Sequence, residues 1–443
     1  MDKVVPKGGR GVRVRDQSPG AVVSQELSAA FAPGALPERL GVAVSGGGDS
    51  TALLLLARDW ARSHGVALAA VTVDHGLRPE ATQEARGVAE VCAGLGIAHE
   101  VLRWDGWSGA GNLQAEARAA RYRLMAGWAR ETGVTAIALG HTMDDQAETV
   151  LLRLARGSGV DGLSGMAPQR RALGVAWLRP LLGLRRAALR AFLRERGVGW
   201  AEDPSNDDPR YDRVRARAAL TALASLGIGV AGLVETAARL SEARAALEEA
   251  ARGAAARIIR VEAGDVLIDA AALRALPGEV RERILAHALC WVASAEYRPR
   301  HAALRRLMER ALNGAGGTLH GCLVTAHAGV LRLSREPCAV AGLRVPVAKV
   351  WDGRWRLIAP LRQDVAPDAP RPPGMTVAAL GEAGLRACPD WRASGLPRAT
   401  LLASPAVWCG GDLLAAPLAG KGEGWVARLE HGTVGLFKMT LSD

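Results

Sequence analysis

Short apolar segments and longer amphipathic segments alternate along residues 38–220. The apolar segments predict β-strands at 41–44, 67–73, 98–104, 135–139 and 175–178. The segments between them carry apolar residues at helical spacing and predict helices at 51–64, 80–95, 112–132 and 144–156. This alternation is typical of an α/β fold with a doubly wound parallel sheet, which binds ligands at the carboxyl ends of its strands.

The pattern changes beyond this region. A basic amphipathic helix is predicted at 181–196, and another helix at 213–223 after a polar loop. Helical periodicity then continues to residue 313, whereas glycine-bounded apolar segments after residue 316 predict strands, interrupted by a proline-rich connector at 360–373. We therefore expect a partly disordered N-terminal extension at 1–37, with a short helix at 22–31, and a catalytic domain at 38–220. A helical domain at 221–315 and a small β-rich domain at 316–443 would follow.

The charge of the chain favours a polyanionic partner. The 443 residues carry a formal net charge of +11, and nearly all of the positive charge is arginine. The planar donor fork of arginine suits phosphate groups, which points to nucleic acid. Genomic base composition is the alternative explanation, because it would also enrich alanine and glycine.

Cysteine spacing and hydropathy argue against several classes of protein. The six cysteines form no C-x-x-C pair, so neither a zinc ribbon nor an iron–sulfur site is indicated. No apolar run approaches the roughly 20 residues of a membrane span, and the polar, basic start of the chain lacks a signal-peptide pattern. We expect a cytoplasmic protein with no membrane partner.

A glycine-rich turn follows the first predicted strand. It consists of Ser45, Gly46, Gly47, Gly48, Asp49 and Ser50, and a helix begins directly after it. Glycines allow backbone N–H groups to approach a ligand closely, and a helix N-terminus favours an anion such as phosphate. The turn matches neither G-x-G-x-x-G nor the Walker loop. A turn without a ligand is the alternative, but it leaves Asp49 without a task.

Two other strand ends carry polar groups. The second strand ends in Asp74 and His75, which an Asx-turn alone could also explain. The fourth strand is followed by His141, Asp144, Asp145 and Glu148 at helical spacing. A helix-capping box would explain one acid there but not the histidine or the remaining acids. Carboxylates beside a phosphate loop can hold Mg²⁺, and one of them could deprotonate an amine nucleophile.

These motifs, in this order, resemble those of bacterial tRNA(Ile)-lysidine synthetases, members of the N-type ATP pyrophosphatase (PP-loop) superfamily. The superfamily motif is Ser-Gly-Gly-x-Asp-Ser at 45–50. The resemblance extends over residues 40–217 and includes V-D-H-G-L-R at 73–78, the segment 116–122, R-P-L-L at 179–182, W-A-E-D-P-S-N at 200–206 and Y-D-R at 211–213. Val214 departs from the family, which usually has asparagine there, and the N-terminal extension is unusually long.

The resemblance implies a reaction and its partners. ATP would adenylate O2 of the wobble cytidine in the isoleucine tRNA with a CAU anticodon, and the amine of free L-lysine would then displace AMP to give lysidine. A homodimer is common in the family. Sulfur transfer by a related tRNA thiolation enzyme is one rival, although such enzymes use cysteine pairs. Glutamine-dependent synthetases of the superfamily need an N-terminal cysteine, and residue 2 is Asp2. A catalytically inactive RNA-binding relative is the other rival.

The resemblance also implies roles for residues. ATP would contact Ser45, Gly46, Gly47, Gly48, Asp49, Ser50, Asp74 and His75. Mg²⁺ would bind Asp49 and Asp145. The expected catalytic set is Asp49, Arg121, His141, Asp144, Asp145 and Glu148, with Asp144 or Glu148 as the base and with Arg121 and His141 stabilising the adenylated intermediate. The expected tRNA-phosphate contacts are Arg185, Arg186, Arg190, Arg194, Arg213 and Arg217.

Overall fold

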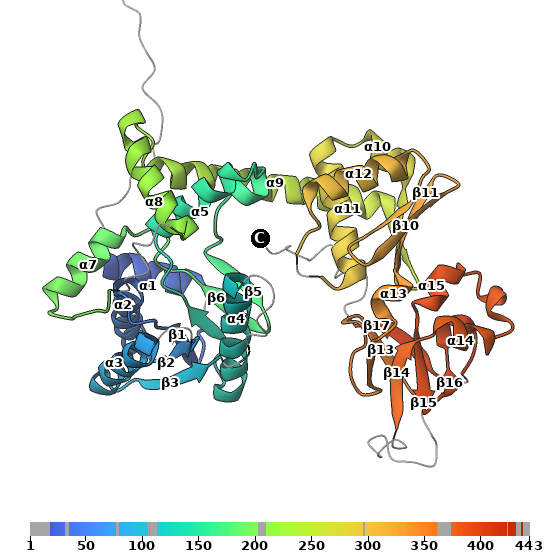
Figure 1. Ribbon diagram of the computed structural model, residues 1–443, viewed down its shortest axis with the longest axis horizontal. Coiled ribbons are helices and arrows are strands. Elements are labelled where there is room, and N and C mark those ends of the chain that lie inside the picture. The colour runs from blue at the N-terminus through green and yellow to red at the C-terminus, as the bar shows by residue number, and fades with distance from the viewer. Residues whose placement is uncertain are drawn as a thin grey trace, which may run out of the picture. The chain divides into compact units, whose positions relative to one another are not determined.

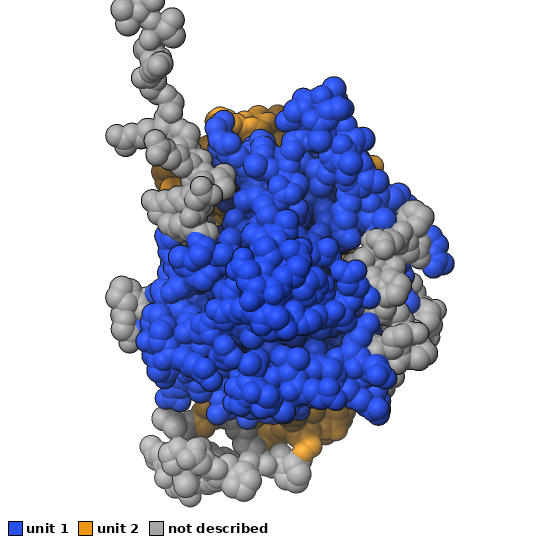
Figure 2. Space-filling view, turned by 90° about the vertical axis from the view of Figure 1, so that its left-hand side faces the viewer, with its two compact units in different colours: residues 1–242 blue, residues 243–443 orange. Residues whose placement is uncertain are grey.

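The computed structural model describes residues 18–31, 35–76, 79–104, 106, 113–202, 210–295, 297–360, 374–422, 424–430 and 436. The chain forms two compact units, residues 1–242 and 243–443 (Figure 2). The predicted disorder near the N-terminus and nearly all of the predicted proline-rich connector lie outside the described residues, as do Leu77, Arg78, Asn112 and residues 203–209.

A six-stranded sheet forms the centre of the first unit (Figure 1). Its strands are β1 (Arg39–Ala43), β2 (Ala67–Asp74), β3 (Ala98–Arg103), β4 (Ala136–Ala138), β5 (Gln169–Ala172) and β6 (Val175–Leu178). The order is β3-β2-β1-β4-β6-β5, and every neighbouring pair is parallel except β5 and β6. The strand order reverses between β1 and β4, which is where a sheet of this kind binds ligands.

Helices cover both faces of this sheet. One core contains residues of α1 (Pro19–Ala29), α2 (Gly48–His64), α3 (Pro79–Leu95) and α7 (Arg186–Glu195), and the other contains residues of α4 (Leu113–Thr132). Val42 lies in the first core and its neighbour Ala43 in the second, because successive strand residues point to opposite faces. The predicted doubly wound α/β fold is confirmed.

The remaining elements of the first unit follow the sheet in sequence. They are α5 (Met143–Ala155), α6 (Val160–Leu163), α8 (Asp212–Leu223), η2 (Ala224–Leu226) and the long α9 (Val230–Ile258), which continues into the second unit. Strand β5 was not predicted. It turns back onto β6 through Leu173 and Gly174, both with positive φ, and leucine is not a residue that signals such a turn in sequence.

The second unit begins with a five-stranded sheet covered by helices. The strands are β7 (Ile259–Glu262), β8 (Asp265–Asp269), β9 (Gly317–Leu319), β10 (Cys322–His327) and β11 (Val330–Arg335), in the order β7-β8-β11-β10-β9. The helices are α10 (Ala270–Ala275), α11 (Gly278–Ala293) and α12 (His301–Leu312). Strands β7 and β8 lie in the segment predicted to be helical, so this sheet takes strands from both sides of the boundary predicted at residue 315.

The last part of the second unit is rich in strands, as predicted. After α13 (Pro337–Val340), a four-stranded sheet contains β12 (Arg344–Pro346), β14 (Met375–Ala379), β15 (Pro405–Cys409) and β16 (Asp412–Ala415). Strands β13 (Trp355–Ile358) and β17 (Val426–Leu429) pair separately. Four short helices accompany them: α14 (Gly381–Arg386), η3 (Trp391–Ser394), α15 (Arg398–Leu402) and η4 (Pro417–Ala419).

Across the described residues, no single helix has the length and apolar character needed to cross a membrane. Residues 212–226 and 230–258 meet that test only when they are taken together, and a bend of 98° separates them.

Candidate functional site

The glycine-rich turn joins β1 to the N-terminus of α2 at the reversal point of the sheet. Gly46 has a φ of 87°, a conformation that favours glycine. Ser50 fixes the turn, since its hydroxyl accepts a hydrogen bond from the Ser45 N–H at 3.1 Å and donates one to the Gly47 carbonyl at 2.9 Å. Gly47 is the N-cap of α2, and no described side chain caps the helix there. The first N–H groups of α2 are therefore available to an anion.

A distant segment packs against this turn. The Ala201 N–H donates to the Gly46 carbonyl at 2.9 Å. The indole of Trp200 lies so close to Gly48 that an added Cβ there would be 3.3 Å from the ring. Both residues belong to the W-A-E-D-P-S-N motif, but the sequence alone assigned them no functional role. Their contact with the turn could not be read from spacing, because the two segments are far apart in the chain.

Gly140, two residues after β4, allows a test of whether the geometry of the glycine-rich turn matters for ATP binding. A Cβ on Gly140 would lie 3.2 Å from both the backbone nitrogen and the Cα of Ser50, so Gly140→Ala must push the turn outward by a few tenths of an ångström. We expect the affinity for ATP, measured by calorimetry, to fall about five- to tenfold, the equivalent of the ~1 kcal/mol typical of mild overpacking. Gly87→Ala is the control, because beyond its chain neighbours and the backbone of its own helix no described atom lies within 4 Å of a Cβ placed at that position. Equal affinities in the two variants would contradict the expectation.

Helix α5 presents the acids that follow β4. Thr142 caps the helix, and the predicted capping box is present: the Asp145 carboxylate accepts from both the N–H and the hydroxyl of Thr142, each at 2.8 Å. Burial alone would raise the pKa of Asp145, but Arg186, Thr142 and Arg213 together lower it below the ordinary value. Asp145 is thus both a structural cap and a buried anion that faces arginines.

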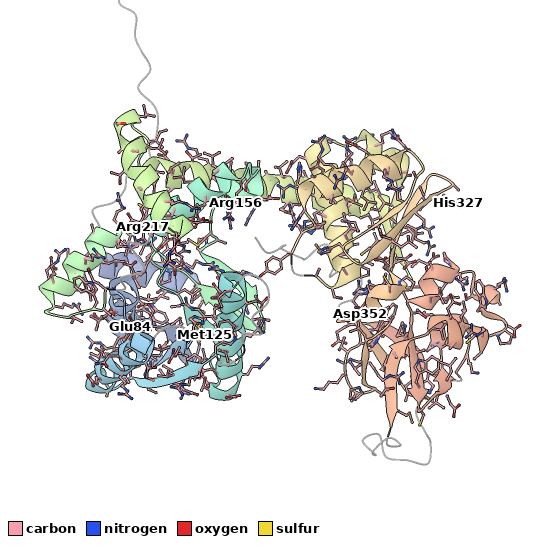
Figure 3. All side chains as sticks on the ribbon, viewed as in Figure 1. Glu84, Met125, Arg156, Arg217, His327 and Asp352 are labelled. Carbon is pink, nitrogen blue, oxygen red and sulfur yellow. The ribbon has the colours of Figure 1, made fainter. Side chains whose placement is uncertain are left out.

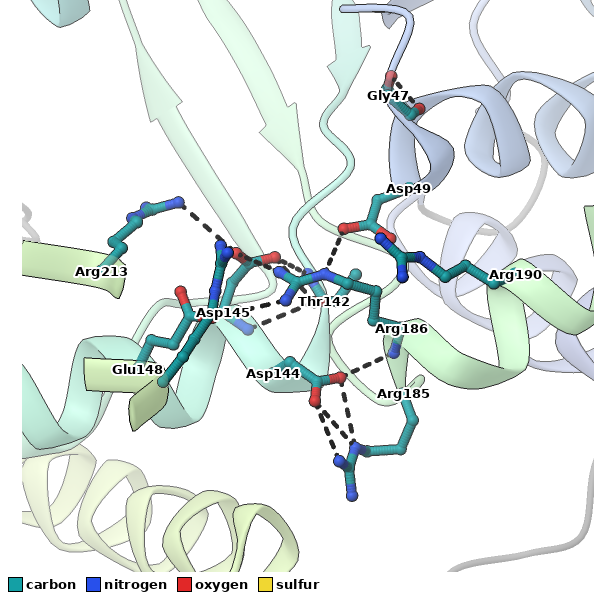
Figure 4. Close-up of polar contacts among 12 residues, drawn as sticks. Gly47, Asp49, Thr142, Asp144, Asp145, Glu148, Arg185, Arg186, Arg190 and Arg213 are labelled. Atoms are coloured by element: carbon teal, nitrogen blue, oxygen red, sulfur yellow. Dashed lines mark hydrogen bonds and ion pairs between the residues drawn. The ribbon is translucent and has the colours of Figure 1, made fainter. Parts of the chain in front are cut away.

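Arg186, the first residue of α7, joins three carboxylates (Figure 4). Its Nε donates to Asp49 Oδ2 at 2.9 Å and its Nη2 to Asp145 Oδ1 at 3.1 Å, while Nη1 lies 3.5 Å from Glu148 Oε1. Burial raises the pKa of Asp49, and Arg186 offsets part of that shift. These contacts show that Asp49, on the phosphate loop, lies near the acids of α5.

Helix α8 contributes two more arginines to the same cluster. Arg213 Nη1 lies 3.5 Å from Asp145 Oδ1 (Figure 4). Arg217, labelled in Figure 3, donates from Nε to Glu148 Oε1 at 2.7 Å. The Glu148 side chain is only 1% exposed. Its second oxygen, Oε2, is buried without a hydrogen-bond partner among the described residues. A buried carboxylate oxygen without a donor is a natural acceptor for a substrate group.

Asp144 lies at the edge of this cluster and has different partners. Both of its oxygens accept from Arg185 Nε, at 3.2 and 3.3 Å, and Oδ2 also accepts from the Arg186 backbone N–H at 2.7 Å. Asp144 therefore fixes the N-terminus of α7, where a carboxylate also suits the helix dipole. Its hydrogen-bonding capacity is largely used within the protein.

A second group of candidate residues, which follow β2 and β4 or lie on α4, is cationic or neutral. Burial lowers the pKa of His141 to about 3, with Arg179 contributing, so this histidine is neutral at neutral pH. Burial and then Arg121 lower the pKa of His75, whose ring packs edge-on against Trp104 at 5.8 Å. Burial also lowers the pKa of Arg121 itself. The Nδ1 atoms of His75 and His141 lack partners among the described residues. Such groups suit a buried anionic ligand.

Asp74 instead organises the turn that follows β2. Its carboxylate accepts from the Gly76 N–H at 2.9 Å and from the Thr82 hydroxyl at 3.2 Å. This is the Asx-type turn considered from the sequence.

The predicted tRNA-contacting arginines have diverse surroundings. Arg194 is exposed, and Arg190 lies 3.6 Å from the exposed carboxylate of Glu202. Arg185 binds Asp144, and Arg213 and Arg217 bind the acids of α5. Arg186 is the clearest difference from expectation, since its guanidinium contacts three carboxylates of the candidate site. Only three-dimensional contacts reveal this, because Arg186 is 137 residues from Asp49.

The described residues contain no group of three or more histidine, cysteine or acidic side chains arranged to hold a metal ion. Asp49 and Asp145 nevertheless approach one another closely enough to share one guanidinium. Mg²⁺ is usually held by one or two carboxylates together with substrate phosphates. The two acids beside the phosphate loop fit that kind of site.

Comparisons with known proteins agree with this geometry. Residues 20–224 match a protein family described as the PP-loop domain. A tRNA(Ile)-lysidine synthase from Ruegeria pomeroyi is 49% identical over 407 residues, 92% of this chain and 94% of the relative. Those from Hyphomonas neptunium and a Bradyrhizobium species are 43% and 41% identical, over 68% and 71% of this chain and 84% and 95% of the relatives.

Proposed function

The chain belongs to the tRNA(Ile)-lysidine synthase family, and we propose that it ligates L-lysine to C2 of the wobble cytidine of the CAU-anticodon isoleucine tRNA. Membership of this family makes the protein a ligase that forms lysidine on tRNA(Ile), and its PP-loop domain makes ATP the energy source. The main support for the proposal is that Asp49, in the glycine-rich loop, lies near Asp145 and Glu148 of α5 at one end of the sheet.

In the first proposed step, cytidine O2 attacks the α-phosphorus of ATP and pyrophosphate leaves. The N–H groups at the start of α2 would bind the leaving pyrophosphate. Asp49 and Asp145 would hold Mg²⁺, which supplies charge neutralisation for the triphosphate. Arg121 would supply positive charge to the adenylate. The neutral rings of His75 and His141 would lie against it, because their Nδ1 atoms have no hydrogen-bond partner among the described residues.

In the second proposed step, the lysine amine attacks C2 and AMP leaves with the bonding electrons. The free amine has a pKa near 10.4, so it must lose a proton before it attacks. From the sequence alone, Asp144 and Glu148 are equally suitable as the base that accepts this proton. The contacts favour Glu148, because both Asp144 oxygens bind Arg185, whereas Glu148 Oε2 is buried without a donor among the described residues.

Residues 38–220 would form the catalytic domain, and residues 221–315 and 316–443 would hold the body of the tRNA. Within the first unit, the exposed arginines of α7 are the best placed for phosphate contacts. Leu189 and Leu193 bury one side of this helix, and Arg190 and Arg194 lie on its exposed side. We also propose a homodimer, which light scattering would detect.

Salt dependence tests the phosphate contacts. Each neutralised phosphate releases counterions, so we expect the logarithm of the tRNA association constant to fall linearly with the logarithm of salt concentration. Arg194→Ala should reduce the magnitude of that slope by about 1, with little change in the preference for one tRNA over another. Filter binding at four salt concentrations measures both quantities. An unchanged slope in the variant would contradict the assignment of Arg194.

The reaction itself is tested with radiolabelled lysine, ATP, Mg²⁺ and the isoleucine tRNA transcript. We expect lysine-dependent labelling of the tRNA with one AMP released for each lysine incorporated. AMP release without lysine label would indicate a different nucleophile, as in a thiolation relative. The absence of both products would favour a catalytically inactive RNA-binding protein.

A further inference from the structure

Arg186 lies in the position that a metal ion would be expected to take. Its guanidinium contacts Asp49, Asp145 and Glu148 at 2.9, 3.1 and 3.5 Å, and these acids come from two helices at the reversal point of the sheet (Figure 4). A cation therefore already lies between Asp49 and Asp145, the two acids that would hold Mg²⁺, with Glu148 beside it.

The cluster carries no net negative charge. The carboxylates of Asp49, Asp145 and Glu148 lie against the guanidinium groups of Arg186, Arg213 and Arg217, and the charge of Arg190 also acts on Asp49. A divalent cation that entered alone would meet no net negative charge and would lie beside three arginines. Electrostatic repulsion at such short range is strong in a partly buried site. The nucleotide-free cluster should therefore bind divalent metal weakly.

The geometry of α7 lets Arg186 move without moving the helix. Its backbone N–H is bonded to Asp144, which Arg185 also holds, so the Cα position is fixed. The side chain is 21% exposed and joins its guanidinium to that fixed point through a flexible stem. A guanidinium group binds a phosphate group as readily as it binds a carboxylate group. An arriving triphosphate could thus attract Arg186 away from the acids and leave them to the metal.

We propose that Arg186 is an internal counter-ion that occupies the divalent-cation position in the nucleotide-free protein and makes metal entry depend on the nucleotide. The identity of the nucleotide as ATP rests on the proposed function, but the exclusion of free metal does not. Arg186 is in this sense a positioning residue, because its location determines whether Asp49 and Asp145 can bind a metal ion.

Mn²⁺ binding without nucleotide, followed by electron paramagnetic resonance, tests this proposal with no need for tRNA, lysine or turnover. The unaltered protein should bind Mn²⁺ weakly, and Arg186→Gln should bind it at least about tenfold more tightly, since one full charge is removed at short range. Arg186→Lys retains the charge and should behave like the unaltered protein. Arg62→Gln, at an exposed position of α2 that has no role in the proposed reaction, is the control and should also bind weakly.

Two results would overturn the proposal. One is tight Mn²⁺ binding by the unaltered protein without nucleotide, which needs no variant and so does not depend on any variant folding. The other is equal Mn²⁺ affinity in Arg186→Gln and Arg186→Lys, since the exclusion would then not arise from charge. A failure of the proposed lysine ligation would leave these measurements unchanged, so the two proposals fail separately.

Discussion

Asp49→Ala should abolish AMP release while leaving the protein folded. Asp49 lies at the start of α2 and binds Arg186, and burial raises its pKa, so its ionised form is costly and contributes little to folding. Loss of this carboxylate removes one proposed metal ligand and its charge from the phosphate site. We expect the rate of ATP cleavage to fall by at least ~10²–10³-fold, the effect typical of removing a principal electrostatic contact. Single-turnover release of labelled AMP measures it.

Asp59→Ala is the matched control for that experiment. Asp59 lies on the same helix but forms exposed ion pairs with Arg58 and Arg196, away from the loop. It should keep its rate of AMP release, and both variants should unfold within a few degrees of the unaltered protein. Normal turnover in Asp49→Ala would refute the assignment of this residue.

Glu148→Gln should separate the two proposed steps. The Glu148 side chain is 1% exposed, and Gln146 and Ala147 beside it are buried, so an isosteric amide fits without repacking. In the proposed scheme, adenylation does not need this base, whereas the attack of lysine does. We expect pyrophosphate release to continue and lysine transfer to fall by ~10²–10⁴-fold, the usual contribution of a general base. Quenched-flow assays of pyrophosphate and labelled lysine measure the two steps separately.

Glu195→Gln, at an exposed position of α7, should leave both steps unchanged. If Glu148→Gln slowed pyrophosphate release as much as lysine transfer, Glu148 would belong to the adenylation step instead. If Asp144→Asn alone blocked lysine transfer, Asp144 would be the base despite its bonds to Arg185.

The sequence predicted the α/β unit well because its signals are local. Strands β1 and β2 are mainly apolar runs, the first followed by the serine and glycines of the turn and the second ending at Asp74. Helix α5 begins with a capping box that is visible in four consecutive residues. The elements that it missed lack such signals. Strands β7 and β8 are short and follow a 29-residue helix, so the helical periodicity of that helix masked them.

The sequence predicted which acids belong to the candidate site but not which arginines bind them. Asp49, Asp145 and Glu148 were recognised from their position after strands, which places them at one edge of the sheet. The partner of each acid could not be inferred, since Arg186 and Arg217 approach from helices whose orientation depends on packing. For the same reason, the sequence alone left Asp144 and Glu148 equivalent as candidates for the proposed base, since it does not show that Asp144 binds Arg185.

The most direct test of the account is a chase experiment with ATP labelled at the α-phosphate. The protein, tRNA(Ile) and labelled ATP are mixed without lysine, and unlabelled lysine is added afterwards. The account predicts that label first becomes attached to the tRNA and is then released as AMP when lysine arrives. If no label ever reached the tRNA while lysine was still incorporated, adenylation of the cytidine would be contradicted.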